Sequence, residues 1–73
     1  MSALRKRSVR VAGHPTSVSL EDAFWSALVE IARRRGTTPA RLIDEIDARR
    51  GAHGLSSAIR VFVLGHYRAA PER

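Results

Sequence analysis

The sequence predicts a mainly α-helical domain with one short β-strand and three helices in each chain. Residues 16–20 alternate small hydroxyl and aliphatic side chains, which is the pattern of a strand with one buried face. Three later segments carry apolar residues at helical spacing, and glycine-containing breaks at residues 36 and 51–54 separate them. Together these elements make one small domain in a chain of 73 residues.

A single core of this size is marginally stable unless disulfides, a metal ion or a second chain support it. The sequence contains no cysteine, and its three histidines are scattered. We therefore expect no metal and no other cofactor, and a second copy of the chain as the support. No apolar run approaches the ~20 residues that span a bilayer, and the first residues lack the apolar region of a signal peptide. These features predict a cytoplasmic protein.

The charge balance predicts an anionic partner. Lys and Arg number 13 against 7 acids, which gives a formal net charge of +6, and twelve of the 13 cations are arginine. The arginine fork donates two parallel hydrogen bonds to a phosphate. This composition favours nucleic acid first, then an anionic membrane surface or an acidic protein.

Residues 1–13 are predicted to form a basic N-terminal arm, which is either a solvated tail or a segment that lies along a phosphate backbone. Residues 8–12 also alternate, so they fit either a second strand in a local hairpin or a kinked extension of the strand that follows. We favour one strand that begins near Thr16, because Pro15 cannot donate a ladder hydrogen bond. The cations of the arm are Arg5, Lys6, Arg7 and Arg10.

A lone strand leaves its backbone N–H and C=O groups unpaired. The simplest partner is the same strand of a second chain, so this strand predicts a homodimer. The first helix is then expected over residues 21–35, with Ser19 as its N-cap and Asp22 completing a pattern like a capping box. A second helix is expected over residues 39–49, capped by Thr38.

The third helix is predicted to start at residues 55–56 and to continue to about residue 68, although Val61 to Leu64 alone also fits a buried strand. It is apolar on most faces, so in a chain this short a second chain has to cover part of it. The domain is predicted to span residues 14–69 and to end in a frayed tail at residues 70–73. The side chains predicted to form the core of a dimer are Val18, Leu20, Phe24, Leu28, Ile31, Ile59, Phe62 and Val63.

Enzymatic activity has no support in the sequence. There is no pair of nucleophile and base, no metal-binding constellation and no glycine loop that cradles phosphate. Asp44 and Asp47 share a helical face, but no histidine stands at a useful spacing from them.

The chain resembles the ribbon-helix-helix superfamily of MetJ and Arc type. The resemblance rests on the strand TSVSLE, on the stripe formed by Phe24, Leu28 and Ile31, and on the turn at residues 36–38. In the longer strings KRSVRVAGHPTSVSLEDAFWSALVEIA, LIDEIDARRG and LSSAIRVFVL, over about residues 6–67, it resembles a bacterial subfamily that carries a third helix.

This resemblance implies an intertwined ribbon-helix-helix homodimer that acts as a transcription regulator, such as a repressor, on double-stranded DNA. Two strands would pair antiparallel and enter the major groove. Serines at 17 and 19 would face the bases, and the start of the second helix would hold a phosphate. The predicted DNA-binding residues are Arg5, Lys6, Arg7, Arg10, Ser17, Ser19, Thr37 and Thr38.

The outward strand positions depart from the family pattern, because Pro15, Ser17 and Ser19 are small and discriminate poorly between bases. Either specificity is modest, or Lys6, Ser8 and Arg10 of the arm read the DNA, or DNA is not the ligand. The alternative function is a protein-interaction module, antitoxin-like or an adaptor, that docks a partner through the apolar third helix. Binding to a membrane surface through the arm ranks last.

Overall fold

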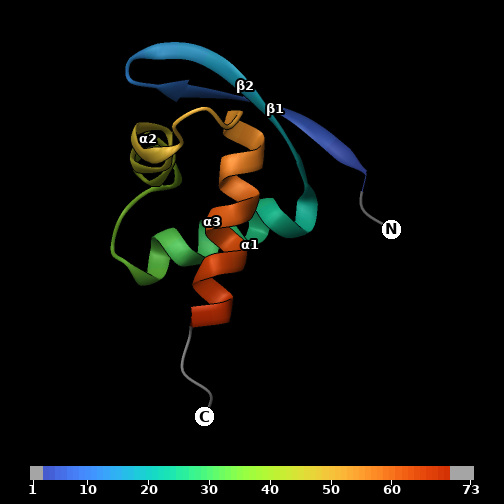
Figure 1. Cartoon of the computed structure of the whole chain (residues 1–73), viewed down its shortest axis with the longest axis vertical. Helices are drawn as coiled ribbons and strands as arrows, with labels where there is room; N and C mark the ends of the chain where they lie inside the picture. Colours follow the sequence, from blue (N-terminus) through green and yellow to red (C-terminus); the bar gives the residue numbers. More distant parts are fainter. Residues whose placement is uncertain (1–2, 70–73) are drawn as a thin grey trace.

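The computed structural model describes residues 3–69. Figure 1 shows a curved two-stranded hairpin with three helices gathered on one of its faces. The tail predicted to fray, residues 70–73, lies outside the described residues. In chain order the elements are β1 (Leu4–Val11), β2 (His14–Glu21), α1 (Asp22–Arg34), α2 (Pro39–Arg49) and α3 (Leu55–Ala69).

The prediction of one strand is wrong, because residues 4–11 of the basic arm form a second strand. β1 pairs antiparallel with β2 in a register that runs from Leu4 opposite Glu21 to Val11 opposite His14. Residues 4–7 do not alternate apolar and polar side chains, yet they pair with residues 18–21. Since β2 finds its partner within the chain, an unpaired strand no longer argues for a second chain.

A two-residue turn joins the strands. Ala12 and Gly13 both have positive φ angles, 51° and 83°, as a type I′ hairpin turn requires. A left-handed conformation costs a residue with a Cβ roughly 1–2 kcal/mol. The Ala12 N–H donates to Asp44 Oδ1 over 2.9 Å, which ties the tip of the hairpin to α2 and offsets part of that cost. Asp44 therefore has a structural role.

The helices lie close to their predicted limits. α2 spans the predicted residues, and the Arg41 N–H donates to Thr38 Oγ1 over 3.2 Å, so the predicted cap is confirmed. The start of α1 differs, since its N-cap is Glu21 and no side chain caps it. Ser19 is instead part of β2, because the strand continues for two residues beyond it.

One apolar core lies between the hairpin and the helices. Six of the eight side chains predicted for a dimer core are fully or almost fully buried within this single chain, and only Phe24 and Phe62 are partly buried. Within the single chain α3 leaves part of its apolar surface open: Val61 is 62% exposed, Leu64 53% and Tyr67 45%. The buried core consists of Val11, Val18, Leu20, Leu28, Ile31, Ala32, Leu42, Ile43, Ile46, Ala58, Ile59 and Val63.

Candidate nucleic-acid interface

The register of the hairpin gathers polar side chains on one face. Directly opposite residues of an antiparallel pair point to the same side of the sheet. Val11, Val18 and Leu20 are buried and define the face of the hairpin toward the helices. The side chains at the alternate positions of each strand therefore point away from the helices. That outward face carries four cross-strand pairs, which are Leu4 with Glu21, Lys6 with Ser19, Ser8 with Ser17, and Arg10 with Pro15.

This outward face is basic and largely open to solvent. Six of its eight side chains are exposed, and Ser19 and Glu21 are half-buried. Its two cations are Lys6 and Arg10, and its one acid, Glu21, is paired with Arg60 of α3. The Arg10 Nη1 donates to the Gly13 carbonyl over 2.9 Å, which holds the guanidinium near the turn. The predicted residues Lys6, Arg10, Ser17 and Ser19 are thus brought together on one surface.

The predicted residues Arg5 and Arg7 lie on the opposite face of β1. The Arg7 Nη2 donates to Asp22 Oδ1 over 3.1 Å, and its guanidinium lies 4.6 Å from the centre of the Trp25 ring. Its Nε is buried and has no hydrogen-bond partner among the described residues. The Arg5 Nε is 3.7 Å from the same oxygen of Asp22, although its side chain is mostly exposed. Both arginines therefore hold β1 against α1.

Side chains of α3 close the outer edge of β2. The Ser19 N–H donates to Ser56 Oγ over 3.0 Å, and the Ser19 carbonyl accepts from Arg60 Nη2 over 3.1 Å. The Arg60 Nε also donates to Glu21 Oε1 over 3.0 Å. A hydrogen bond of its own backbone and the Arg60 guanidinium together hold the pKa of Glu21 below its ordinary value of 4.5.

The sequence did not predict these contacts between α3 and β2. The one available signal was that Arg60 is the only charged residue between Leu55 and Leu64. A lone arginine on an otherwise apolar helix has to reach either solvent or a polar partner. Here it reaches the backbone of β2, which leaves β2 less open to a further strand than the sequence suggested.

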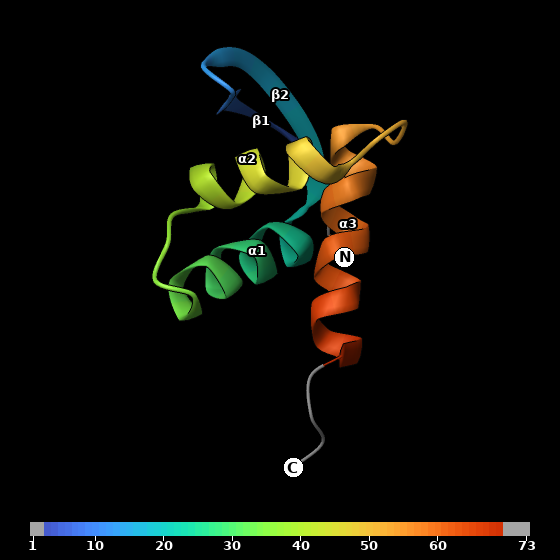
Figure 2. The same cartoon turned by 60° about the vertical axis from the view of Figure 1, so that its left-hand side comes forward.

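Thr37 and Thr38 belong to a different part of the molecule, the loop between α1 and α2. The Thr37 N–H donates to the Ala32 carbonyl over 2.9 Å as part of the end of α1, where Gly36 has a φ of 71°. The Thr37 amide is therefore not free to bind a phosphate. Figure 2 shows the start of α2 below the hairpin, separate from its outward face.

No group of three or more possible metal ligands occurs within residues 3–69. Over the same residues, no helix is long and apolar enough to cross a membrane. The outward face offers cations and hydroxyl groups, which suit phosphates and base edges.

A basic two-stranded ribbon backed by helices defines a class of nucleic-acid-binding domain. The family model described as "Ribbon-helix-helix domain" matches residues 4–67, and the chain belongs to this family. The predicted resemblance is thereby confirmed. Members of the family generally bind DNA, typically as dimers, and act as transcription regulators or antitoxins; they are not enzymes.

A solved structure supports the same fold. The chain is similar to an uncharacterized protein from Bordetella pertussis Tohama I, with 35% sequence identity and a TM-score of 0.75. The match covers 90% of this chain and 57% of that one, so the chain spans little more than half the length of its structural relative. No curated protein gives a significant match.

Proposed function

We propose that this protein is a DNA-binding transcription regulator that places the outward face of the β1–β2 hairpin in the major groove. The observation that carries this proposal is the exposure of Lys6, Arg10 and Ser17 on one face, with Lys6 opposite Ser19 and Arg10 near the turn. The major groove, about 12 Å wide, admits a two-stranded ribbon. In this chain a single copy supplies both strands of that ribbon.

The side chains of the outward face have separate roles in this proposal. Arg10 can donate two hydrogen bonds to a guanine, which gives the site its strongest means of base selection. Lys6 neutralises a phosphate, and Ser17 and Ser19 bond base edges with little discrimination. Arg7 acts indirectly, since its contacts with α1 fix the strand that presents its neighbours.

The phosphate contacts extend beyond the hairpin in the same proposal. Arg5 keeps most of its side chain exposed and can reach the DNA backbone beside the ribbon. The start of α2, capped by Thr38, adds the positive end of a helix dipole. We further propose that the regulator works as a homodimer in the bacterial cytoplasm, most simply as a repressor, in keeping with the dimers typical of its family.

Fluorescence polarisation with labelled genomic fragments tests the proposal. Binding is expected at about 50 mM salt and should weaken steeply as salt is added. Lys6→Ala should lower the slope of log affinity against log salt by about 0.9, the value for one lost phosphate contact. Arg10→Ala should weaken binding and relax the preference for guanine. Arg68→Ala removes the same charge from α3, far from the hairpin in Figure 1, and should leave the slope unchanged.

Two results would contradict this function. One is the absence of binding at low salt, where phosphate contacts are strongest. The other is an equal loss of affinity in Arg68→Ala and Arg10→Ala, since that would show attraction by net charge without a defined face.

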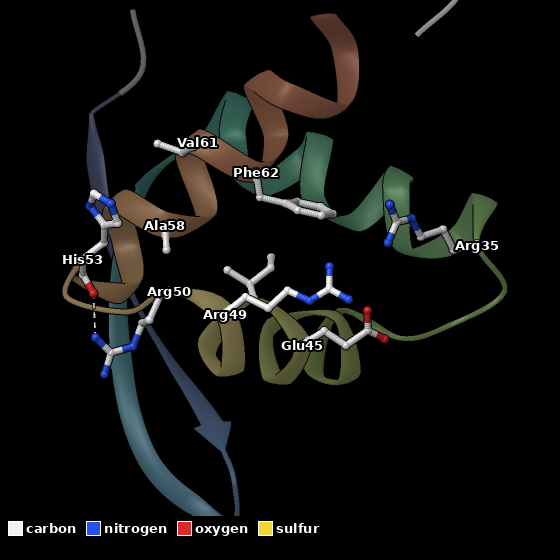
Figure 3. A pocket seen from close by; sticks show the side chains of 9 residues that line it. Arg35, Glu45, Arg49, Arg50, His53, Ala58, Val61 and Phe62 are labelled. Atoms are coloured by element: carbon white, nitrogen blue, oxygen red, sulfur yellow. Dashed lines mark hydrogen bonds between the residues drawn. The ribbon is translucent and has the colours of Figure 1, made fainter. Parts of the chain in front are cut away.

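A second candidate function is docking of an acidic protein partner in a groove between α2 and α3. Figure 3 shows the apolar side chains of Val61 and Phe62 above this groove and arginines around it. Its volume of about 190 Å³ lies below the roughly 300–1,000 Å³ of small-molecule sites, so it suits one large apolar side chain of a partner. The cations on its rim are Arg35, Arg49 and Arg50.

This alternative predicts that the purified chain captures a stoichiometric acidic partner from cell extract. Val61→Glu would place a carboxylate in the groove and abolish the capture. Capture that survives this substitution would exclude the groove as the docking site.

A further inference from the structure

The turn of the hairpin is joined to α2 by a hydrogen bond from the backbone to a carboxylate. The Ala12 N–H donates to Asp44 Oδ1 over 2.9 Å, between residues that lie 32 positions apart in the chain. Figures 1 and 2 both show the turn above α2. No cation within residues 3–69 pairs with the Asp44 carboxylate, so its partner is the backbone of the turn.

The charge of Asp44 is unfavourable for the proposed function. This residue is exposed and lies at the tip of a hairpin whose outward face carries Lys6 and Arg10. A carboxylate in that place repels the phosphates that the two cations attract. The presence of an acid here is therefore explained by the hydrogen bond that it accepts and not by its charge.

The residue that Asp44 holds has a backbone conformation that favours glycine. Ala12 has a φ of 51°, in the left-handed region that a side chain with a Cβ rarely adopts. The hydrogen bond from its N–H fixes the peptide plane that enters the turn. Asp44 thereby favours the conformation of Ala12 that the hairpin turn requires over the right-handed ones that alanine prefers.

The position of the turn in its place decides where Arg10 points. The Arg10 Nη1 donates to the carbonyl of Gly13, the residue that follows Ala12, over 2.9 Å. This contact uses one of the five N–H donors of the guanidinium and leaves the others for a base edge. A movement of the turn moves the Gly13 carbonyl, and the guanidinium of Arg10 moves with it.

The other anchors of the hairpin are far from the turn. The Arg7 Nη2 donates to Asp22 of α1, and the Ser19 N–H donates to Ser56 of α3. Along the strands, at about 3.3 Å per residue, these contacts lie roughly 16–20 Å from the turn. Among residues 3–69, the contact with Asp44 is the one side-chain hydrogen bond that joins the turn to a helix.

We propose that Asp44 is a positioning residue for base selection, whose carboxylate holds the hairpin turn on α2 and thereby fixes Arg10 against a guanine edge. The inference rests on the proposed function, in which Arg10 selects the base. It adds a residue that acts on the DNA only through the turn. Asp44 is therefore expected to control the discrimination between bases and not the phosphate contacts, which are independent of sequence.

A comparison of Asp44→Ala with Asp44→Asn tests the proposal. Both substitutions remove one negative charge, but asparagine keeps an oxygen that can accept from the Ala12 N–H. The probes are a duplex that the wild type selects from a randomised library and its counterparts in which one G·C pair at a time becomes A·T. The ratio of their Kd values at fixed salt measures discrimination, and the wild type is expected to reach about 5- to 100-fold at one pair.

Asp44→Ala should lose most of this ratio and fall within about threefold of Arg10→Ala, whereas Asp44→Asn should stay within about threefold of the wild type. Glu45→Ala, at the next exposed position of α2, removes the same charge and should also keep the ratio. A modest loss of stability does not change the ratio, because a fraction of unfolded chain weakens binding to both duplexes equally. The salt dependence should be the same in the two Asp44 variants.

Ala12→Gly combined with Asp44→Ala separates positioning from the relief of strain. Glycine adopts the conformation of this turn without the cost that alanine carries, so the hairpin turn can form in the double variant without the carboxylate. The double variant should still lack discrimination, because its turn is not joined to α2. Restored discrimination would overturn the inference, as would an equal loss in Asp44→Ala and Asp44→Asn or a full ratio in Asp44→Ala.

The failure of this inference is distinguishable from that of the proposed function. Discrimination that is lost in Arg10→Ala and kept in Asp44→Ala would refute the inference alone. The absence of DNA affinity in the wild type would refute the proposed function and with it the role in base selection. Hydrogen exchange of the Ala12 amide would then still show whether the carboxylate holds the turn, since exchange should be faster in Asp44→Ala and unchanged in Asp44→Asn.

Discussion

The two faces of β1 use the same residue type for different purposes. Arg7 and Arg10 lie three positions apart on this strand, and the alternation of a strand places them on opposite sides. Arg7 contacts Asp22 and Trp25 of α1, whereas Arg10 is exposed and donates to the carbonyl of Gly13 in the turn. A basic segment is therefore not one binding surface, because the strand period divides it into a structural half and a solvent-facing half.

The largest difference in stability between the two faces is expected from two positions of β2 that lie three residues apart. Leu20→Ala removes a fully buried side chain from the core and should lower the free energy of unfolding by about 2–5 kcal/mol. Ser17→Ala, on the outward face, should change it by less than about 0.5 kcal/mol. Urea denaturation measures both. Comparable losses in the two variants would mean that the hairpin is not one-sided.

A smaller effect is expected from the two arginines. Arg7→Ala removes a partly buried ion pair and a cation–π contact and should cost about 1–2 kcal/mol of unfolding free energy. Arg10→Ala should cost less than about 0.5 kcal/mol. Thermal unfolding of both variants in the same buffer gives the comparison. It would fail if Arg10→Ala proved the more destabilising of the two.

The smallest effect concerns Glu21, where the outward face of β2 meets α3. Its pKa is lower in the folded chain than in the unfolded chain, so its contribution to stability is present above the ordinary value of 4.5 and is lost as pH falls through the folded pKa. The contribution is modest because Glu21 is only half-buried and solvent screens its ion pair with Arg60. Unfolding of Glu21→Gln should differ slightly from the wild type at neutral pH, and the difference should vanish in acid. A difference that grows in acid would have the wrong sign.

The helices were the most predictable part of the fold. Their limits follow from local signals, such as the Thr38 cap, the glycine at position 36 and the apolar spacing, and each of these acts over a few residues. The same signals identify Val61 to Leu64 as helical, because α3 is too long for a buried strand. The ribbon-helix-helix family also follows from these residues and from the strand pattern.

The hairpin was less predictable, because the first half of β1 has no alternation of apolar and polar residues. Its pairing is supported instead by contacts with distant elements, such as Arg7 with Asp22 and Ala12 with Asp44. The hydrogen bonds that close the edge of β2 join Ser19 to Ser56 and Arg60, which lie 37 and 41 positions later in the chain. No local pattern encodes contacts of that separation.

The separation of the predicted DNA-binding residues onto two faces of β1 also depends on contacts between distant residues. The sequence correctly suggested Lys6, Ser8 and Arg10 as an alternating set, but it could not decide which face that set would occupy. Only the buried side chains of the partner strand, such as Val18, fix the outward direction. Composition alone does not distinguish the two faces, so it could not separate Arg7, which contacts α1, from the residues of the outward face.

The most direct measurement of the central claim is a map of backbone amide chemical shifts in a ¹⁵N-labelled chain titrated with duplex DNA. Insertion of the outward face of the hairpin should shift the amides of Lys6, Ser8, Arg10 and Ser17 at the lowest DNA concentrations and leave those of the C-terminal half of α3 unchanged. Shifts confined to the arginines around the α2–α3 groove, with an unperturbed hairpin, would contradict the account.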